Sequence, residues 1–351
     1  LEDDLMRRDF TMNAIAYGPS KERLVDLYNG ASDIKDKMIR AVGKAEDRFE
    51  EDALRILRAV RFAAQHGFAI EHETMSAMQK KSELLSNISA ERIRDEFLKM
   101  VDSAEPMVGV MMSQRLGILK FIVPELEIGI GVKQNGEHIY DVWEHNLRTM
   151  QHAADKEWPL HIRLAGLFHD IAKPHTRAWS KEKNDYTFYG HEVVGAKITK
   201  KICERLRFSG ELTDKVTRLV RHHMFFSDPD QITLSAVRRL VSKVGADNVW
   251  DLIDLRICDR IGMGRPKEEP YRLRKFESMI KEVMRDPISV SMLAVDGNRL
   301  IEMGFAPGPR MGWVLHALLE EVLDDPKKNL KEYLEGRAEQ LNQMTDEHLK
   351  K

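Results

Sequence analysis

A helical repeat of apolar residues constrains the fold of this chain more than any other feature. Phe49, Ala53, Ile56, Val60 and Ala63 recur at roughly the period of an α-helix, which places them on one face. Charged residues make up 32% of the 351 residues and aromatic residues 7%, a balance that suits a helix-rich protein better than a sheet protein. We therefore expect a mainly α-helical chain, with further helices at 72–84, 90–101 (Ser89 as N-cap), 104–118, 309–324 and 328–349.

The first 46 residues carry the predicted β structure. Residues 1–17 indicate a helix, Arg23-Leu-Val-Asp-Leu27 an extended segment, and Asn29-Gly30 a turn before another strand. This segment is too small to bury a core of its own, so we expect it to complete a sheet whose other strands precede Leu1. The chain also begins without methionine inside a patterned segment, and we expect it to be a fragment.

The composition of the chain limits the binding partners and the cellular compartment that we expect for it. The net charge of −2 gives no general nucleic-acid signature, so any RNA contact has to come from local basic patches. Cys203 and Cys258 are the only cysteines, which excludes a disulfide framework and fits a reducing cytoplasm. We find no apolar run near 18 residues and no signal peptide, so we expect a cytoplasmic protein with no membrane partner.

An acidic and a basic residue lie on the free side of the helix predicted over 48–62. Asp52 and Arg55 are three residues apart, so on one helix their side chains would be neighbours. A carboxylate facing an amino group and a guanidinium facing a ring nitrogen would accept adenine or cytosine and reject guanine or uracil. The alternative is an ordinary salt bridge on a solvated helix.

Histidines concentrate in the middle of the chain, where nine of the 13 lie between residues 138 and 223. His169 and Asp170 are adjacent, His145 lies on an earlier predicted helix, and Asp259 follows on a later one. Imidazole and carboxylate ligands suit a divalent ion such as Mn, Fe, Zn, Ni or Mg, without distinguishing these metals. Each histidine taken singly could instead be an ordinary core or surface residue.

Further residues near this set could extend the site. His191 and the pair His222-His223 leave room for a second metal ion. Lys173, four residues after His169 on the same helical face, could pair with a phosphate.

Several motifs, in order along the chain, together resemble the class II tRNA nucleotidyltransferases, which add the CCA end to tRNA and are close relatives of bacterial poly(A) polymerases. Three of them are Arg7-Arg-Asp-Phe-Thr-Met-Asn13, Glu51-Asp-Ala-Leu-Arg55 and Ser89-Ala-Glu-Arg-Ile93 with Glu96. The motifs Asp141-Val-Trp-Glu-His145, Phe168-His-Asp170 and Gly190-His191 resemble the HD domain that many of these enzymes carry. The resemblance implies four parts: 1–46, a C-terminal remnant of the nucleotidyltransferase head; 47–128, a helical neck; 129–264, an HD phosphohydrolase-like domain; and 265–351, a helical tail.

The resemblance also implies roles for individual residues. Arg8 and Asp9 would contact the ribose and phosphates of the incoming nucleotide, supported by Asn13. Asp52 and Arg55 would form the template that selects CTP or ATP. Arg58 and Arg61 would lie towards the triphosphate. Asp26, Gly30 and Asp33 would belong to a flexible element between head and neck. A divalent metal in the HD site would be bound by His145, His169, Asp170 and Asp259. The implied partners are tRNA, ATP and CTP, with Mg²⁺ for the transfer, and no protein partner is evident.

One departure from the family pattern affects the reaction. Nucleotidyl transfer in this family needs a Gly-Gly or Gly-Ser segment followed by two carboxylates spaced D-x-D on a strand, which hold two metal ions. The sequence has Asp228-Pro-Asp230, but proline is a poor strand residue and no glycine-rich segment precedes it, so we interpret it as a loop. We therefore expect residues 1–351 to bind nucleotide weakly and not to polymerise alone.

Two other hypotheses remain open. The chain could be a stand-alone HD phosphohydrolase that acts on cyclic phosphodiesters or nucleotides, with the N-terminal helices as a binding module. It could also be a non-enzymatic, RNA-binding helical scaffold with a degenerate HD site. Within the nucleotidyltransferase hypothesis, poly(A) polymerase is the rival, and the HD segment and nearly neutral charge favour tRNA.

Overall fold

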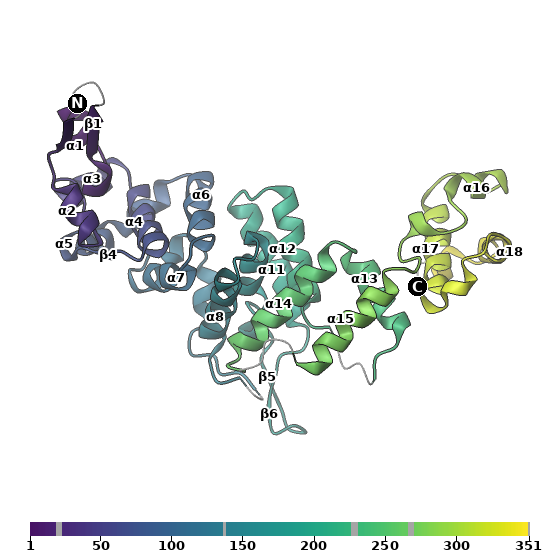
Figure 1. The fold of residues 1–351 in the computed structure, drawn as a ribbon. Helices are drawn as coiled ribbons and strands as arrows, with labels where there is room; N and C mark the ends of the chain where they lie inside the picture. The colour runs from purple at the N-terminus through teal and green to yellow at the C-terminus, as the bar shows by residue number, and fades with distance from the viewer. Residues whose placement is uncertain (19–22, 136–137, 226–230, 266–269, 350–351) are drawn as a thin grey trace. The chain divides into compact units, whose positions relative to one another are not determined.

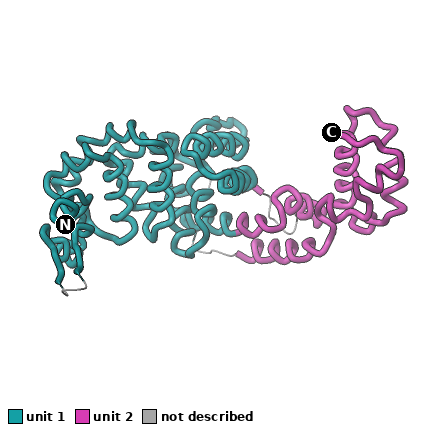
Figure 2. The backbone as a smooth tube through the Cα atoms, turned by 90° about the horizontal axis from the view of Figure 1, so that it is seen from above, with its two compact units in different colours: residues 1–223, 254–268 teal, residues 224–253, 269–351 magenta. Residues whose placement is uncertain are grey.

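The computed structural model describes residues 1–18, 23–135, 138–225, 231–265 and 270–349. Most of these residues are helical, and the sheets among them have two strands each. The predicted mainly α fold is confirmed. Figure 1 shows these elements along the chain. Contacts divide the chain into unit 1, residues 1–223 and 254–268, and unit 2, residues 224–253 and 269–351 (Figure 2). Asp228-Pro-Asp230 lies outside the described residues.

The N-terminal part of unit 1 contains small β elements between short helices. Strands β1 (Ile15–Gly18) and β2 (Arg23–Asp26) pair antiparallel, and β3 (Met38–Ile39) pairs parallel with β4 (Ala69–Ile70). The other elements are α1 (Glu2–Met6), η1 (Thr11–Asn13) and α2 (Gly30–Lys35). The predicted long helix over residues 1–17 was therefore wrong, because the chain turns into η1 and β1 after Met6.

The turn at Asn29-Gly30 leads into helix α2 and not directly into a strand as predicted. Asn29 has a φ of 57°, a left-handed conformation that asparagine tolerates. A Cβ on Gly30 would lie 2.1 Å from the Thr11 carbonyl oxygen, so only glycine lets α2 approach η1 this closely.

The helix predicted over 48–62 is broken at Asp52. Helix α3 (Ala45–Glu51) ends there, Asp52 is extended (φ −154°, ψ 101°), and α4 runs from Leu54 to His66. The Asp52 carboxylate accepts a hydrogen bond from the Leu54 backbone N–H at 3.1 Å, the kind of local bond with which Asp competes against helical bonding. The predicted apolar face is confirmed on both helices, because Phe49, Ala53, Ile56, Val60 and Ala63 are all buried.

The elements that follow α4 contribute to the same hydrophobic core as α4. They are α5 (His72–Lys81), η2 (Ser82–Asn87), α6 (Ala90–Val101), α7 (Pro106–Arg115), η3 (Leu119–Phe121) and η4 (Pro124–Gly129). Helix α6 has the predicted bounds with Ser89 at its N-cap, although the Ser89 side chain makes no capping hydrogen bond. Phe97, Met100 and Val101 on α6 are buried in the same core as Ile56 and Val60 on α4.

The second half of unit 1 is a helical array that surrounds the histidines. It comprises α8 (Val142–Asp155), α9 (Leu160–Phe168), α10 (Lys173–Thr176), the antiparallel hairpin β5 (Ala178–Ser180) and β6 (Asp185–Thr187), α11 (His191–Arg205), α12 (Gly210–His222) and the end of α14 (Asn248–Gly262). A Cβ on Gly262 would lie 2.2 Å from Thr149 Oγ1 and 3.1 Å from the His145 carbonyl oxygen. Glycine at this position therefore lets α14 lie directly against α8, which brings Asp259 to His145.

Unit 2 is also helical. Its elements are α13 (Leu234–Val244), the first part of α14, α15 (Tyr271–Val283), η5 (Val290–Met292), α16 (Gly297–Glu302), α17 (Pro309–Asp324), η6 (Pro326–Lys328), α18 (Lys331–Asn342) and α19 (Asp346–Leu349). Helix α17 has the predicted bounds, whereas the helix predicted over 328–349 is divided into η6, α18 and α19. Arg310 donates to the carbonyls of Asn342 and Met344 where α18 ends, which satisfies backbone acceptors left by the helix. Within the described part of the chain, no helix combines the length and apolar character needed to cross a membrane.

Candidate nucleotide pocket and metal centre

An open pocket of about 490 Å³ lies where the chain breaks between α3 and α4. Three segments distant in sequence form it: the residues around η1, the start of α4, and α6. Its lining residues are Arg7, Arg8, Asp9, Asn13, Asp52, Leu54, Arg55, Arg58, Phe62 and Arg92. The structure thus brings together six of the seven residues predicted from the sequence to bind nucleotide.

Asp52 and Arg55 do not pair with each other as the salt-bridge alternative requires. Asp52 Oδ2 lies 2.7 Å from Arg92 Nη2 on α6. Arg55 pairs with Glu51 at 2.8 Å, and its guanidinium also donates to the Arg7 carbonyl at 2.7 Å. Asp52 and Arg55 both line the pocket, and each is held by different partners.

A hydrogen-bonded group around Asp9 forms the adjoining wall. Asp9 Oδ1 accepts from Asn13 Nδ2 at 3.0 Å and from the Phe10 backbone N–H at 2.9 Å. Arg58 Nη2 lies 2.7 Å from Asp9 Oδ2, and a third of the Arg58 side chain remains exposed (33%). Arg8, half exposed, pairs with Asp4 at 3.0 Å. Arg58 and Arg8 thus keep exposed guanidinium surface toward solvent, where an anion could bind.

Arg61 lies differently from the other predicted residues, because it does not contribute to the pocket wall described above. Its side chain is buried, and Nε donates to Glu96 Oε2 at 2.6 Å. The guanidinium carbon lies 4.0 Å from the centre of the Phe62 ring, and Phe62 does line the pocket. In this structure Arg61 supports the pocket from behind.

Side-chain hydrogen bonds connect the residues predicted to belong to a flexible element. Asp26 accepts from the Gly30 and Ala31 backbone N–H groups at 2.8 and 2.9 Å. Asp33 accepts from Thr11 Oγ1 at 2.6 Å and pairs with Arg40 at 3.2 Å. These bonds connect α2 to η1, the segment that carries Asn13.

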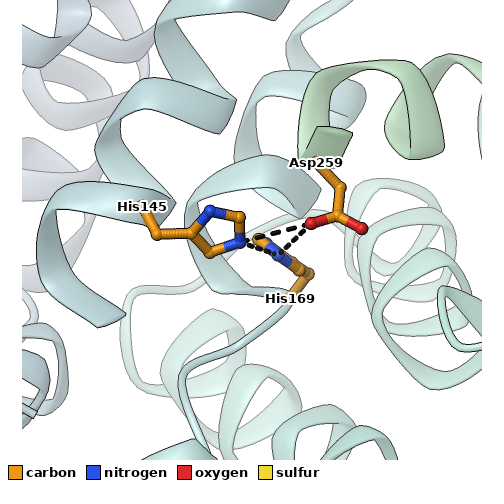
Figure 3. Close-up of side chains that lie close together, drawn as sticks. All are labelled: His145, His169 and Asp259. Atoms are coloured by element: carbon orange, nitrogen blue, oxygen red, sulfur yellow. Dashed lines mark hydrogen bonds and ion pairs between the residues drawn. The ribbon is translucent and has the colours of Figure 1, made fainter. Parts of the chain in front are cut away.

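A second group of side chains is buried between α8, the end of α9 and α14. His145 Nε2, His169 Nε2 and Asp259 Oδ1 converge on one point (Figure 3). The His145–His169 distance between these atoms is 3.0 Å, and Asp259 Oδ1 lies 3.3 and 3.7 Å from the two nitrogens. Asp170 Oδ2 lies 3.2 Å from His145 Nε2 and 3.3 Å from His169 Nε2.

These separations fit ligands of a single divalent ion. Ligand atoms about 2.0–2.2 Å from a metal, at angles between octahedral and tetrahedral, are separated by about 2.8–3.6 Å. His169 Nδ1 lies 2.8 Å from the Gly166 carbonyl, which can only accept, so Nδ1 carries a proton and Nε2 is directed to the centre. Two such nitrogens 3.0 Å apart would repel unless a proton or a cation lies between them, so the donor set suits a metal.

A third group is joined to the first by the same aspartate. Asp170 Oδ1 lies 3.2 Å from His191 Nε2 and 3.6 Å from His223 Nε2, and these two nitrogens are 3.1 Å apart. Each histidine directs Nδ1 to a backbone carbonyl, His191 to Phe188 and His223 to Val220. Asp170 therefore has one oxygen on each side of a centre with room for two cations.

Of the pair His222-His223, the structure places His223 beside Asp170 and His191. His223 follows buried Leu219 and Val220 by four and three residues, so it continues the buried face of α12. His222 lies one position off that face.

Charges in the centre shift several pKa values. Burial alone would lower the pKa of His169, but the carboxylates of Asp170 and Asp259 raise it to about 10. Burial alone would raise the pKa of Asp170, but His169 and Lys173 hold it well below its usual range. Burial lowers the pKa of His223 to about 4. Without a metal, a proton shared among these groups can offset part of the negative charge of the two carboxylates.

Lys173 and two residues that sequence analysis missed complete the surroundings. Lys173 Nζ lies 2.5 Å from both Asp170 Oδ2 and Gln134 Oε1. The His138 ring packs edge-on against His145 at 5.0 Å, and its buried Nδ1 has no hydrogen-bond partner. Burial lowers the pKa of His138 to about 3. Neither Gln134 nor His138 belongs to a motif quoted from the sequence, whereas Arg92 lies within one of those motifs.

The fold and these two sites define a helical protein that joins a nucleotide-sized pocket to a buried histidine–aspartate centre. Family profiles match three segments: "Poly A polymerase head domain" at residues 1–40, "Probable RNA and SrmB- binding site of polymerase A" at 67–128, and "HD domain" at 142–263. The A-adding tRNA nucleotidyltransferase of Deinococcus radiodurans is 33% identical over 332 residues, covering 91% of this chain and 75% of that protein. The chain therefore belongs to the class II tRNA nucleotidyltransferase family and carries an HD domain.

Other relatives agree with this assignment. The CC-adding tRNA nucleotidyltransferase of Thermus thermophilus is 32% identical over 328 residues, covering 91% of this chain and 73% of that protein. The fold is similar to that of the Bacillus stearothermophilus CCA-adding enzyme, solved in complex with CTP, with a TM-score of 0.65 and 23% identity over 97% of this chain and 74% of that one. The Thermotoga maritima CCA-adding enzyme, solved with tRNA, has a TM-score of 0.51 and 21% identity over 97% of this chain and 74% of that one.

Proposed function

We propose that this chain is the nucleotide-selecting and tRNA-binding portion of an enzyme that adds CCA, CC or A to tRNA 3′ ends from CTP and ATP. The pocket that holds Asp52 and Arg55 beside Arg58 and Asp9 is the observation that carries the proposal. The relatives are named for CC and A addition, and solved relatives are titled as complexes with CTP, ATP and tRNA. We favour tRNA over the arbitrary RNA ends of a poly(A) polymerase because the net charge is only −2.

In this proposal the pocket reads the base with one wall and the phosphates with the other. Asp52 accepts from the amino group of cytosine or adenine, and Arg55 donates to the adjacent ring nitrogen. Arg58 and Arg8 bind triphosphate oxygens, while Asn13 holds Asp9 in place. Residues 1–46 belong to the head, 47–128 to the neck, 129–264 to the HD domain and 265–351 to the tail.

Nucleotide binding to the chain as it stands tests this assignment. Saturation-transfer NMR at high nucleotide concentration should give stronger signals for CTP and ATP than for UTP and GTP. Asp52→Ala should remove that preference, since one good base contact contributes about 1–3 kcal/mol of discrimination. Asp47→Ala, an exposed acid on α3, is the matched control and should leave the preference unchanged. A wild-type protein that binds all four nucleotides equally would overturn the assignment.

We further propose that residues 1–351 do not catalyse nucleotidyl transfer alone. The transfer uses Mg²⁺ held by two carboxylates on a strand, and the sequence offers only Asp228-Pro-Asp230 in that spacing. Incorporation of CTP or ATP by this chain into a tRNA that lacks its 3′ end would refute this.

A second activity is favoured by the buried centre. We propose that the HD domain hydrolyses phosphodiesters or phosphomonoesters when His145, His169, Asp170 and Asp259 hold a divalent ion, with His191 and His223 for a second. Such ions neutralise phosphoryl oxygens and activate water. Water adds to phosphorus, one P–O bond breaks, and the leaving oxygen takes a proton. Lys173 orients Asp170 and provides a cation near the phosphate.

Metal loading and hydrolysis test the second activity together. Protein loaded with Mn²⁺ or Ni²⁺ should hydrolyse bis(p-nitrophenyl) phosphate or a 2′,3′-cyclic nucleotide, and His169→Ala should lose both the metal and the hydrolysis. His72→Ala, an exposed histidine on α5, is the control. Protein that retains tRNA binding but holds no metal would support a scaffold with a degenerate HD site instead.

A further inference from the structure

A short aromatic hairpin lies beside the histidine–aspartate centre. We define it as residues 177–189, which include β5 and β6. Trp179 and Tyr186 are cross-strand partners with ring centres 5.0 Å apart, at an interplanar angle of 80°. Trp179 is 53% exposed and Tyr189 is 73% exposed. In Figure 1 the hairpin projects from the helices of unit 1.

The exposed rings are not explained by packing of the hairpin. Thr187 and Phe188, which follow Tyr186 in the chain, are buried and anchor the hairpin to the protein. Large aromatic side chains normally bury most of their surface, so the two exposed rings of this hairpin leave aromatic surface available to a ligand.

Cations accompany the rings. The Arg177 guanidinium carbon lies 3.6 Å from the centre of the Tyr186 ring. Lys183 Nζ lies 2.8 Å from the Tyr189 hydroxyl and 5.3 Å from the ring centre. Two acids, Glu182 and Asp185, also belong to the hairpin, and Asp185 accepts the Tyr186 backbone N–H at 2.7 Å. Rings interleaved with cations are the pattern by which proteins bind single-stranded nucleic acid.

Both ends of the hairpin are fixed to the metal centre. Before it, Lys173 lies 2.5 Å from Asp170 Oδ2. Near its C-terminal end, the Phe188 carbonyl lies 2.6 Å from Nδ1 of His191, whose Nε2 is 3.2 Å from Asp170 Oδ1. Asn135 also donates to the Tyr186 carbonyl at 2.8 Å. The rings therefore have a defined position relative to Asp170.

We propose that the aromatic hairpin binds single-stranded RNA by stacking bases on Trp179 and Tyr189, and presents the terminal phosphate of that strand to the centre around Asp170. This rests on the proposed hydrolytic function of the HD domain. A single nucleotide would need only one ring. Two exposed rings, Trp179 in β5 and Tyr189 after β6, suit two bases of one strand. Stacking accepts every base, so recognition depends on a flexible strand and a terminal phosphate and not on sequence.

Binding of a fluorescein-labelled six-nucleotide RNA with a 3′-phosphate, measured by anisotropy on the Mn²⁺-loaded chain at low salt, tests the hairpin directly. Trp179→Ala should weaken binding by about fivefold or more, because a base–aromatic stack contributes about 1–3 kcal/mol. Trp179→Phe should retain most of the affinity. Tyr17→Ala, which removes an aromatic residue that is 61% exposed on β1, should bind like wild type. Tyr189→Ala provides an independent variant outside the strands.

Hydrolysis separates the two proposals. Trp179→Ala should slow release of phosphate from the RNA through KM while cleaving bis(p-nitrophenyl) phosphate at the wild-type rate. Equal RNA affinity in wild type, Trp179→Ala and Tyr189→Ala would overturn the stacking proposal, even if the aryl ester is cleaved. A wild-type protein that cleaves no ester would refute the hydrolytic function, while the anisotropy result still decides whether the hairpin binds RNA.

Discussion

Replacing Glu96 tests how the pocket is supported. Glu96 Oε2 accepts from Arg61 Nε at 2.6 Å, and both side chains are nearly buried, with 5% and 10% of their surface exposed. Glu96→Ala leaves a buried guanidinium without its carboxylate, a loss that typically costs about 3–5 kcal/mol. Arg61 would keep Gln65 Oε1 at 3.0 Å and the Phe62 ring, so we expect the lower end, about 3 kcal/mol.

Urea unfolding followed by circular dichroism measures this change, together with hydrogen exchange in α4 and α6 to assign the transition to this region. Asp95→Ala is the matched control on α6, because Asp95 is half exposed and pairs with Arg94, and such pairs contribute about 0.2–1 kcal/mol. The double variant Arg61→Met with Glu96→Met should recover much of the stability, since no buried charge remains. A loss below about 1 kcal/mol in Glu96→Ala would refute the reasoning.

Two further predictions concern the metal centre. Gly262→Ala places a methyl group 2.2 Å from Thr149 Oγ1, so it should push α14 from α8 and lower the metal content measured by mass spectrometry; a normal content would contradict this. In metal-free protein, stability should be highest near pH 6.5. From pH 6.5 down to about pH 4 the unfolded chain binds a proton at His223 that the native state does not bind, so the folding stability falls. From pH 6.5 up to about pH 10 the native state holds a proton on His169 that the unfolded chain has released, so the folding stability falls there too. Melting curves from pH 4 to 10 check this, and a flat profile without metal would contradict it.

The sequence predicted the bounds of two helices because the burial of their side chains follows the helical period. Residues 90–101 and 309–324 have regular apolar patterns, and the structure places α6 and α17 at those bounds. The histidine–aspartate set was predictable for a different reason, since ligands on successive helices of one segment can converge without unusual backbone geometry. The sequence left both His222 and His223 as candidates, and the choice between them depends on the helical phase of α12.

The break at Asp52 could not be read from the same period. Apolar residues continue through it on one face, so the pattern of 48–62 is that of a single helix. The break combines a local bond, from the Leu54 N–H to Asp52, with a tertiary ion pair between Asp52 and Arg92 on α6 that the period does not report. The burial of Arg61 is likewise decided by Glu96, 35 positions away in the chain.

A crystal structure of this chain soaked with CTP or ATP tests the central claim most directly. The account predicts the base in the pocket between α3 and α4, with its amino group and ring nitrogen within hydrogen-bond distance of Asp52 and Arg55 and the phosphates near Arg58. A nucleotide whose base lies elsewhere, with Asp52 still paired to Arg92 and Arg55 to Glu51, would contradict it.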